Sequence, residues 1–234
     1  MTETVTGAKA LITALADAGV DVCFANPGTS EMQLVSAISE EPRIRAVLGL
    51  FEGVVTGAAD GYGRMADKPA LTLLHLGPGL GNGTANLHNA RRAHSPVLNM
   101  IGDHATYHRQ YDAPLTSDIH GFAAPVSDWI GESESASDLA SVGMQGWREA
   151  QVYPGQVASF ITPADHAWSA IETPEKNAGA NEALTALTAV PKADEAAIEA
   201  ATEALRNSQS SCLFLGGMAL REEALFEAGR IAAA

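Results

Sequence analysis

The chain has 234 residues, of which 46% are hydrophobic and 18% are charged. This composition is typical of a folded globular protein and excludes a disordered, collagen-like or coiled-coil chain. The formal net charge of −14 excludes sequence-independent binding to nucleic acid or to an anionic membrane surface, because both need clustered Lys and Arg.

The N-terminal residues lack the basic and apolar regions of a secretory signal, and no segment approaches the roughly 18 consecutive apolar residues of a membrane-spanning helix. We therefore expect a cytoplasmic protein. Its two cysteines, Cys23 and Cys212, each lie in an apolar run typical of a buried strand, so both are predicted to be reduced thiols in the core.

Helices and strands alternate along the first 170 residues. The apolar spacing predicts helices at 6–18, 30–39, 52–65 and 84–94, and strands at 20–25, 45–50, 70–76 and 97–102. After a loop-rich stretch at 103–133, a capping box at 135–138 predicts a helix to about residue 151, followed by a strand at 156–162. Because the strands are nearly continuous apolar runs, we predict a three-layer α/β/α sandwich with a mainly parallel sheet.

The remaining chain predicts a second unit. Residues 172–193 are rich in Pro, Gly and small side chains, as expected of a linker, and they follow a first domain at 1–171. Helices at 194–207 and 219–234 flank a predicted strand at 211–216. Since one strand with two helices cannot cover its own edges, we expect 194–234 to be the beginning of a second α/β domain that is truncated here.

Polar and glycine-rich segments follow three of the predicted strands. Asn26-Pro-Gly-Thr-Ser-Glu31 follows the first, Glu52 opens a helix after the second, and a loop with four glycines at 77–83 follows the third. Each has a purely structural explanation as a turn, a first-turn acid or a helix start. Because ligand sites collect at the carboxyl ends of parallel strands, their shared position indicates a site.

The glycine loop does not have the dinucleotide-binding spacing. Counted from Gly77 or Gly79, the third required glycine falls on Asn82 or Thr84, and no Gly-Lys-Ser/Thr phosphate loop occurs. A nucleotide-binding α/β domain is therefore an alternative that the spacing disfavours.

An ordered set of motifs resembles the N-terminal pyrimidine-binding domain of thiamine-diphosphate-dependent enzymes, in the branch of acetolactate synthase and benzoylformate decarboxylase. The resemblance spans roughly residues 4–170, and 194–234 is similar to the start of the central domain of these enzymes. The motifs are Asn26-Pro-Gly-Thr29, Phe51-Glu52, Ala59-Asp-Gly-Tyr-Gly-Arg64, Gly77-Pro-Gly79 with Asn82, and Ala93-His-Ser-Pro96.

The resemblance implies that Glu52 is a catalytic residue, which hydrogen-bonds the aminopyrimidine ring of thiamine diphosphate and exchanges a proton with it. The bound cofactor then acts as the electron sink for decarboxylation of a 2-oxo acid. By the same resemblance, the residues that contact the cofactor are Asn26, Pro27, Gly28, Glu52, Gly79 and Asn82.

Two further residues are implied as substrate contacts, Thr29 and His75, and His75 is also implied as a catalytic proton carrier. A histidine at the end of a strand can equally make a single backbone hydrogen bond without a role in chemistry. Acetolactate synthases typically have His-Glu-Gln and Thr-Ser-Gly-Pro-Gly where this chain has Phe51-Glu-Gly53 and His75-Leu-Gly-Pro-Gly79, which favours a decarboxylase. The other reading is a non-catalytic interaction module of the same fold.

No metal site is predicted in this sequence. His104 and His108 have metal-ligand spacing, but their segment has little helical periodicity and no cysteine partner. The family binds Mg²⁺ through a Gly-Asp-Gly motif and a later asparagine, whereas Gly102-Asp103 is followed here by histidine. We therefore expect the magnesium site to lie outside this chain, which alone should be inactive, and a homodimer or higher homo-oligomer in the complete enzyme. Flavin binding is left open.

Overall fold

A computed structural model describes residues 4–173 and 190–234. The chain divides into two units, Met1–Thr188 and Ala189–Ala234, and each is described by itself. No helix among the described residues is both long and apolar enough to cross a membrane.

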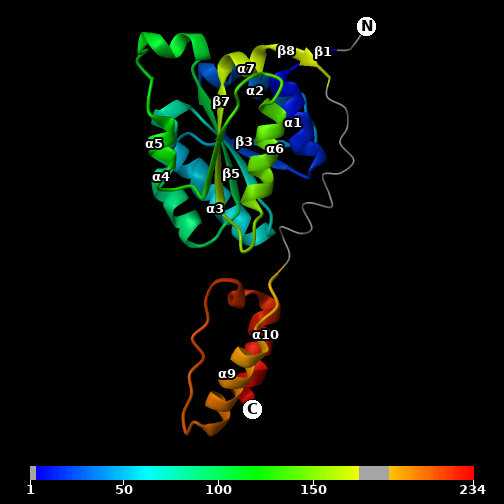
Figure 1. Ribbon diagram of the computed structural model, residues 1–234, viewed down its shortest axis with the longest axis vertical. Helices are drawn as coiled ribbons and strands as arrows, with labels where there is room; N and C mark the ends of the chain where they lie inside the picture. The colour runs from blue at the N-terminus through cyan, green and yellow to red at the C-terminus, as the bar shows by residue number, and fades with distance from the viewer. Residues whose placement is uncertain (1–3, 174–189) are drawn as a thin grey trace. The chain divides into compact units, whose positions relative to one another are not determined.

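The first unit, coloured from blue to yellow in Figure 1, is built around a parallel sheet. The sheet has six strands in the order β3-β2-β4-β5-β7-β6. A short antiparallel pair, β1 with β8, lies apart from it. The strands are β1 Thr4–Thr6, β2 Val22–Asn26, β3 Arg45–Leu48, β4 Ala70–Leu74, β5 Val97–Asp103, β6 Trp129–Glu132, β7 Val157–Pro163 and β8 Ala170–Glu172.

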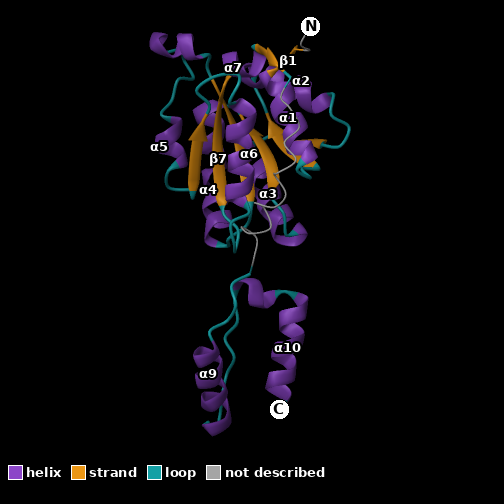
Figure 2. Cartoon of the chain, turned by 45° about the vertical axis from the view of Figure 1, so that its right-hand side comes forward, coloured by secondary structure: helices purple, strands orange, loops and turns teal. Residues whose placement is uncertain are grey.

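Helices cover both faces of the parallel sheet, as Figure 2 shows by secondary structure. Alternate residues of each central strand point to opposite faces, so Leu71 and Leu73 pack with α1, α2 and α6, while Ala70 and Leu74 pack with α3, α4 and α5. The helices are α1 Gly7–Asp17, α2 Met32–Ser39, α3 Glu52–Ala66, α4 Leu76–Arg92, α5 Ile119–Ala123, α6 Leu139–Ala150 and α7 Ala164–Trp168, with 3₁₀ turns η1 Thr29–Glu31 and η2 Thr106–Tyr111. The predicted three-layer sandwich is confirmed.

The capping box predicted before α6 also forms. The backbone N–H of Ser135 donates to Asp138 Oδ1 at 2.9 Å, and the backbone N–H of Asp138 donates back to Ser135 Oγ at 3.4 Å. This reciprocal pair satisfies two backbone donors at the entrance to the helix.

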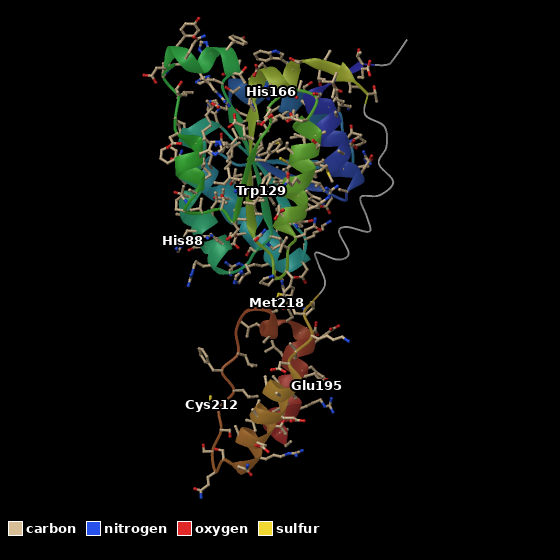
Figure 3. The ribbon with its side chains drawn as sticks, viewed as in Figure 1. His88, Trp129, His166, Glu195, Cys212 and Met218 are labelled. Atoms are coloured by element: carbon tan, nitrogen blue, oxygen red, sulfur yellow. The ribbon has the colours of Figure 1, made fainter. Side chains whose placement is uncertain are left out.

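Two local predictions are wrong. The stretch 103–133 contains strand β6, which pairs with β7 at the edge of the sheet. Trp129, labelled in Figure 3, belongs to this strand and lies against Gly146 of α6. The predicted glycine loop at 77–83 is helical, because α4 begins at Leu76 rather than at residue 84.

The second unit contains α9 Glu195–Asn207, the 3₁₀ turn η3 Gly217–Leu220 and α10 Glu222–Ala233. The strand predicted at 211–216 does not form, and Cys212, predicted to be buried, is exposed (Figure 3). An isolated strand has no partner for its backbone groups, and no other strand is present among residues 190–234. Cys23, in contrast, is buried in β2 as predicted.

The predicted linker at 172–193 lies mostly outside the described residues, which omit 174–189. That 194–234 begins a second α/β domain stays a prediction.

An ion-pair network around the buried Glu41 side chain ties the turn before β3 to α1, with Arg43 and Asp17 both partly exposed. Arg43 donates to both carboxylate oxygens of Glu41, at 2.7 and 2.8 Å, and to Asp17 Oδ1 at 2.6 Å. These hydrogen bonds from Arg43 hold the pKa of Glu41 at about 2, below its usual 4.5. Because the pKa is lowered by folding, the stabilisation is present above pH 4.5 and is lost as the pH falls toward 2.

We expect Glu41→Gln to lower the free energy of unfolding at pH 7 and to flatten its dependence on pH in that acidic range. Urea titrations at several pH values measure both. Glu40→Gln is the matched control, because the Glu40 carboxylate is 62% exposed and, among the residues that the structure describes, reaches only Lys9, at 3.4 Å. An equal loss of stability in the two variants would contradict the account.

Candidate active site

Three segments meet at the carboxyl edge of the parallel sheet. The segment from Asn26 to Glu31 follows β2, Glu52 begins α3 after β3, and His75 follows β4. Strands β3, β2 and β4 are neighbours in the sheet, so these three segments are brought together by topology alone.

The turn from β4 into α4 is sharp. Leu76, the first residue of α4, is buried and has φ of +48°, a left-handed conformation that is unusual for a bulky side chain. Such a conformation costs about 1–3 kcal/mol and persists only where the surroundings fix it. It places His75 at the corner between the strand and the helix.

Glu52 faces the first turns of α4. Its Oε2 accepts a hydrogen bond from Asn82 Nδ2 at 3.0 Å, and its Oε1 lies 3.0 Å from the position that a Cβ atom at Gly79 would take. The glycine therefore leaves room for the carboxylate, and the asparagine orients it.

Helices α3 and α4 pack closely enough to fix the first turn of α3. Asn86 Nδ2 donates to the Gly53 carbonyl at 2.6 Å, and Thr56 Oγ1 donates to the Gly83 carbonyl at 3.1 Å. A Cβ at Gly83 would lie 2.8 Å from the Thr56 side chain. The contacts made here offset the roughly 1 kcal/mol by which each glycine disfavours a helix relative to alanine.

A second pair of side chains lies beside this one. Glu31 is fully buried, and its Oε2 lies 2.7 Å from His75 Nδ1 and accepts the Gly28 N–H at 2.6 Å. Burial raises the pKa of Glu31, while the hydrogen bond from Gly28 and the nearby His75 oppose that rise. The Cβ of His75 is 3.4 Å from the Cβ position of Gly79, so the two pairs adjoin across that glycine.

The structure thus brings together most of the residues singled out in the sequence. Glu52, Gly79 and Asn82 are in contact, and Gly28 lies against the imidazole of His75. The other three lie at the end of β2 and just after it: Asn26 ends the strand, Pro27 comes next, and Thr29 opens η1 with an exposed side chain. Among the described residues, Thr29 makes no side-chain hydrogen bond to Glu52 or His75.

From the sequence, Glu31 was named only as the last residue of the segment that follows β2. A carboxylate in the first turn of a helix is ordinarily exposed, and nothing in the sequence spacing shows that this one is buried. Asn86 was also missed, although it lies four residues after Asn82 and therefore on the same helical face.

The remaining histidines lie outside this cluster. The rings of His104 and His108 are 5.4 Å apart around η2, and His166, labelled in Figure 3, lies 2.9 Å from Ser133 Oγ through its Nδ1. Within residues 4–173 and 190–234, no group of three or more His, Cys, Asp or Glu side chains could hold a metal ion.

Comparisons with known proteins place this chain in a family. The chain is 49% identical over 225 residues to IlvX of Mycobacterium tuberculosis, whose name assigns it provisionally as an acetolactate synthase large subunit. It is 31% identical over 148 residues, 63% of this chain, to benzoylformate decarboxylase of Pseudomonas aeruginosa, covering 28% of that protein. Among solved structures, the thiamine diphosphate-dependent 4-hydroxybenzoylformate decarboxylase of Rhodococcus jostii matches 88% of the chain with a TM-score of 0.73 and 25% identity.

This chain corresponds to less than half of these proteins. The match to IlvX covers 96% of this chain and 42% of IlvX, and the match to the Rhodococcus enzyme covers 38% of that enzyme. A model of the thiamine pyrophosphate enzyme N-terminal TPP binding domain matches residues 5–126, about half of the sequence. The chain therefore belongs to the thiamine pyrophosphate enzymes and contains their N-terminal TPP-binding domain.

Proposed function

We propose that this chain supplies the pyrimidine-binding half of the active site of a thiamine-diphosphate-dependent 2-oxo acid decarboxylase or carboligase resembling the acetolactate synthase large subunit. The observation that carries the proposal is the position of the Glu52 carboxylate at the carboxyl edge of the sheet. Asn82 orients it there, and it occupies space that a side chain at position 79 would fill.

The residues at this edge fit an aminopyrimidine ring. Such a ring offers both hydrogen-bond donors and acceptors, and Glu52 with Asn82 offers a carboxylate and an amide in contact with each other. When bound, the cofactor supplies the electron sink for cleavage of the bond next to the oxo group. Glu52 would hold a proton and exchange it with the ring. The hydrogen bonds between α3 and α4, from Asn86 to Gly53 and from Thr56 to Gly83, would keep the carboxylate in place.

His75 would serve as the proton carrier for the substrate, with Thr29 as a neighbouring hydroxyl. Among the described residues, His75 Nε2 has no hydrogen-bond partner, and the side chain is 22% exposed, so the atom is free to meet a ligand. The presence of His75, rather than the threonine of acetolactate synthases, supports decarboxylation of a 2-oxo acid as the first reaction to assay.

Large exposed apolar side chains lie around the start of α3: Leu48, Leu50, Phe51 and Val54. Solvated apolar groups gathered beside a site are typical of an interface, and we propose that a second subunit, in a homodimer or larger assembly, covers this surface. Residues 84–92 of α4, in contrast, expose no large apolar side chain. A cytoplasmic location stays a prediction.

The test of the proposed function is turnover in an enzyme completed by a diphosphate-binding domain, supplied by a longer form of this chain or by a partner. We expect cofactor-dependent release of CO₂ from pyruvate or from an aryl 2-oxo acid. If neither substrate is consumed at saturating cofactor and magnesium, the proposal is contradicted and a non-catalytic interaction module is favoured.

We expect the 234-residue chain alone not to bind thiamine diphosphate tightly. The diphosphate group would meet a protein of net charge −14, and the described residues contain no cluster of metal-ligating side chains to hold Mg²⁺ beside it. Titration calorimetry with cofactor and magnesium measures this directly. Micromolar binding that a chelator abolishes would contradict the prediction.

A further inference from the structure

Glu31 is a buried carboxylate whose two oxygens have different surroundings. Its side chain is fully buried, and Oε1 has no hydrogen-bond partner among the described residues. Both polar contacts converge on Oε2, which accepts the Gly28 N–H at 2.6 Å and lies 2.7 Å from His75 Nδ1. A buried carboxylate costs free energy unless it is paired, and both pairings of Glu31 are made through this one oxygen.

Two glycines hold the pair in place. A Cβ atom at Gly102, in β5, would collide with Glu31 Oε1, and a Cβ atom at Gly28 would collide with the imidazole ring of His75. The Glu31 carboxylate therefore packs against the backbone of Gly102, and the His75 ring packs against the backbone of Gly28. Neither side chain can turn far without losing the contact between Glu31 and His75.

With Glu31 ionised, this geometry sets where the imidazole carries its proton. The Gly28 N–H donates to Glu31 Oε2, and a charged carboxylate oxygen has no proton of its own to donate to the ring. An ionised carboxylate at the same position accepts from Nδ1–H, and the hydrogen bond at one ring nitrogen sets the tautomer of the ring. Nε2 is then left with a lone pair.

We infer that Glu31 is a positioning residue that holds His75 as the Nδ1–H tautomer and thereby presents Nε2 as a proton acceptor at the site. The tautomer is a property of this chain. Only its use in proton transfer to and from a substrate rests on the proposed function.

Nitrogen-15 NMR of the histidine rings tests the inference in the full 234-residue chain, with the His75 signals assigned from a His75→Gln sample. In the wild-type chain at neutral pH we expect the Nδ1–H tautomer in roughly tenfold excess or more, because a hydrogen bond to a charged acceptor is among the stronger ones. A predominant Nε2–H tautomer would overturn the inference, whatever the variants do.

Two substitutions separate the hydrogen bond from simple filling of space. Glu31→Leu removes the hydrogen-bond acceptor, and we expect His75 to become a mixture of the Nδ1–H and Nε2–H tautomers without a large excess of either. Glu31→Gln can place its amide oxygen at the Oε2 position, where the Gly28 N–H demands an acceptor, and should restore the wild-type tautomer. An unchanged tautomer in Glu31→Leu, or a mixture in Glu31→Gln, would count against the inference.

Glu41→Gln is the matched control, because it replaces another largely buried carboxylate of the same unit and should leave the His75 signals unchanged. The outcome is independent of the enzyme assay. If the completed enzyme has no turnover while His75 shows the expected tautomers, the proposed function fails and the role of Glu31 stands.

Discussion

Glu52→Gln is expected to lower turnover about 100- to 10,000-fold in a completed, cofactor-loaded enzyme, which is the range that a positioned proton-transfer group contributes. Glutamine keeps the size of the side chain, and Asn82 can still donate to its amide oxygen as it does to Glu52 Oε2. The variant loses the negative charge of the carboxylate and, with it, the ability to exchange a proton. Steady-state kinetics at saturating cofactor, with cofactor affinity measured separately, gives the result.

Asp60→Asn is a matched control on the same helix. Asp60 lies two turns further along α3 and accepts hydrogen bonds from Arg64, at 2.8 Å, and from Ser95, at 2.5 Å. Asp60→Asn should lower the free energy of unfolding of the enzyme while leaving its turnover nearly unchanged. Turnover in Glu52→Gln as high as in the wild type would remove Glu52 from the mechanism.

Gly28→Ala is expected to abolish the role of His75 by displacing its ring, although the His75 side chain itself is unchanged. The added methyl group would collide with the imidazole ring, so the ring must move and its contact with Glu31 is lost. Gly28 has φ of −119°, which any residue can adopt, so the effect is due to the contact and not to backbone strain. We expect turnover to fall about as far as in His75→Ala, roughly 100-fold or more.

The matched control is Gly81→Ala in α4. A Cβ there has no neighbour within 4 Å, and alanine favours a helix by roughly 0.5–1 kcal/mol over glycine. This variant should be at least as stable as the wild type and fully active. Equal turnover in Gly28→Ala and Gly81→Ala would show that the position of the His75 ring does not matter.

The alternation of apolar helices and strands was sufficient to predict the sandwich. Strands β4, β5 and β7 are buried along their whole lengths, so they read clearly as apolar runs. Strand β6 has four half-buried residues, Trp129 to Glu132, and lies at the edge, so it carries no comparable pattern.

The glycines of α4 misled the sequence interpretation for a physical reason. Glycine disfavours a helix when considered locally, and Gly77, Gly79 and Gly83 are accommodated because other segments approach them closely. Those contacts come from Ser117, Glu52 and Thr56, which are distant in the sequence. The position of Glu52 at the sheet edge followed from strand order, whereas the burial of Glu31 and its contact with His75 required the three-dimensional structure.

The most direct test of the central claim is the rate at which the C2 proton of the thiazolium ring exchanges with deuterium when thiamine diphosphate is bound to the completed enzyme. This measurement needs no substrate and isolates the proton transfer assigned to Glu52. We predict that Glu52→Gln binds the cofactor and slows the exchange about 100-fold or more, while Asp60→Asn exchanges at the wild-type rate. Exchange in Glu52→Gln at the wild-type rate, with cofactor bound, would contradict the account.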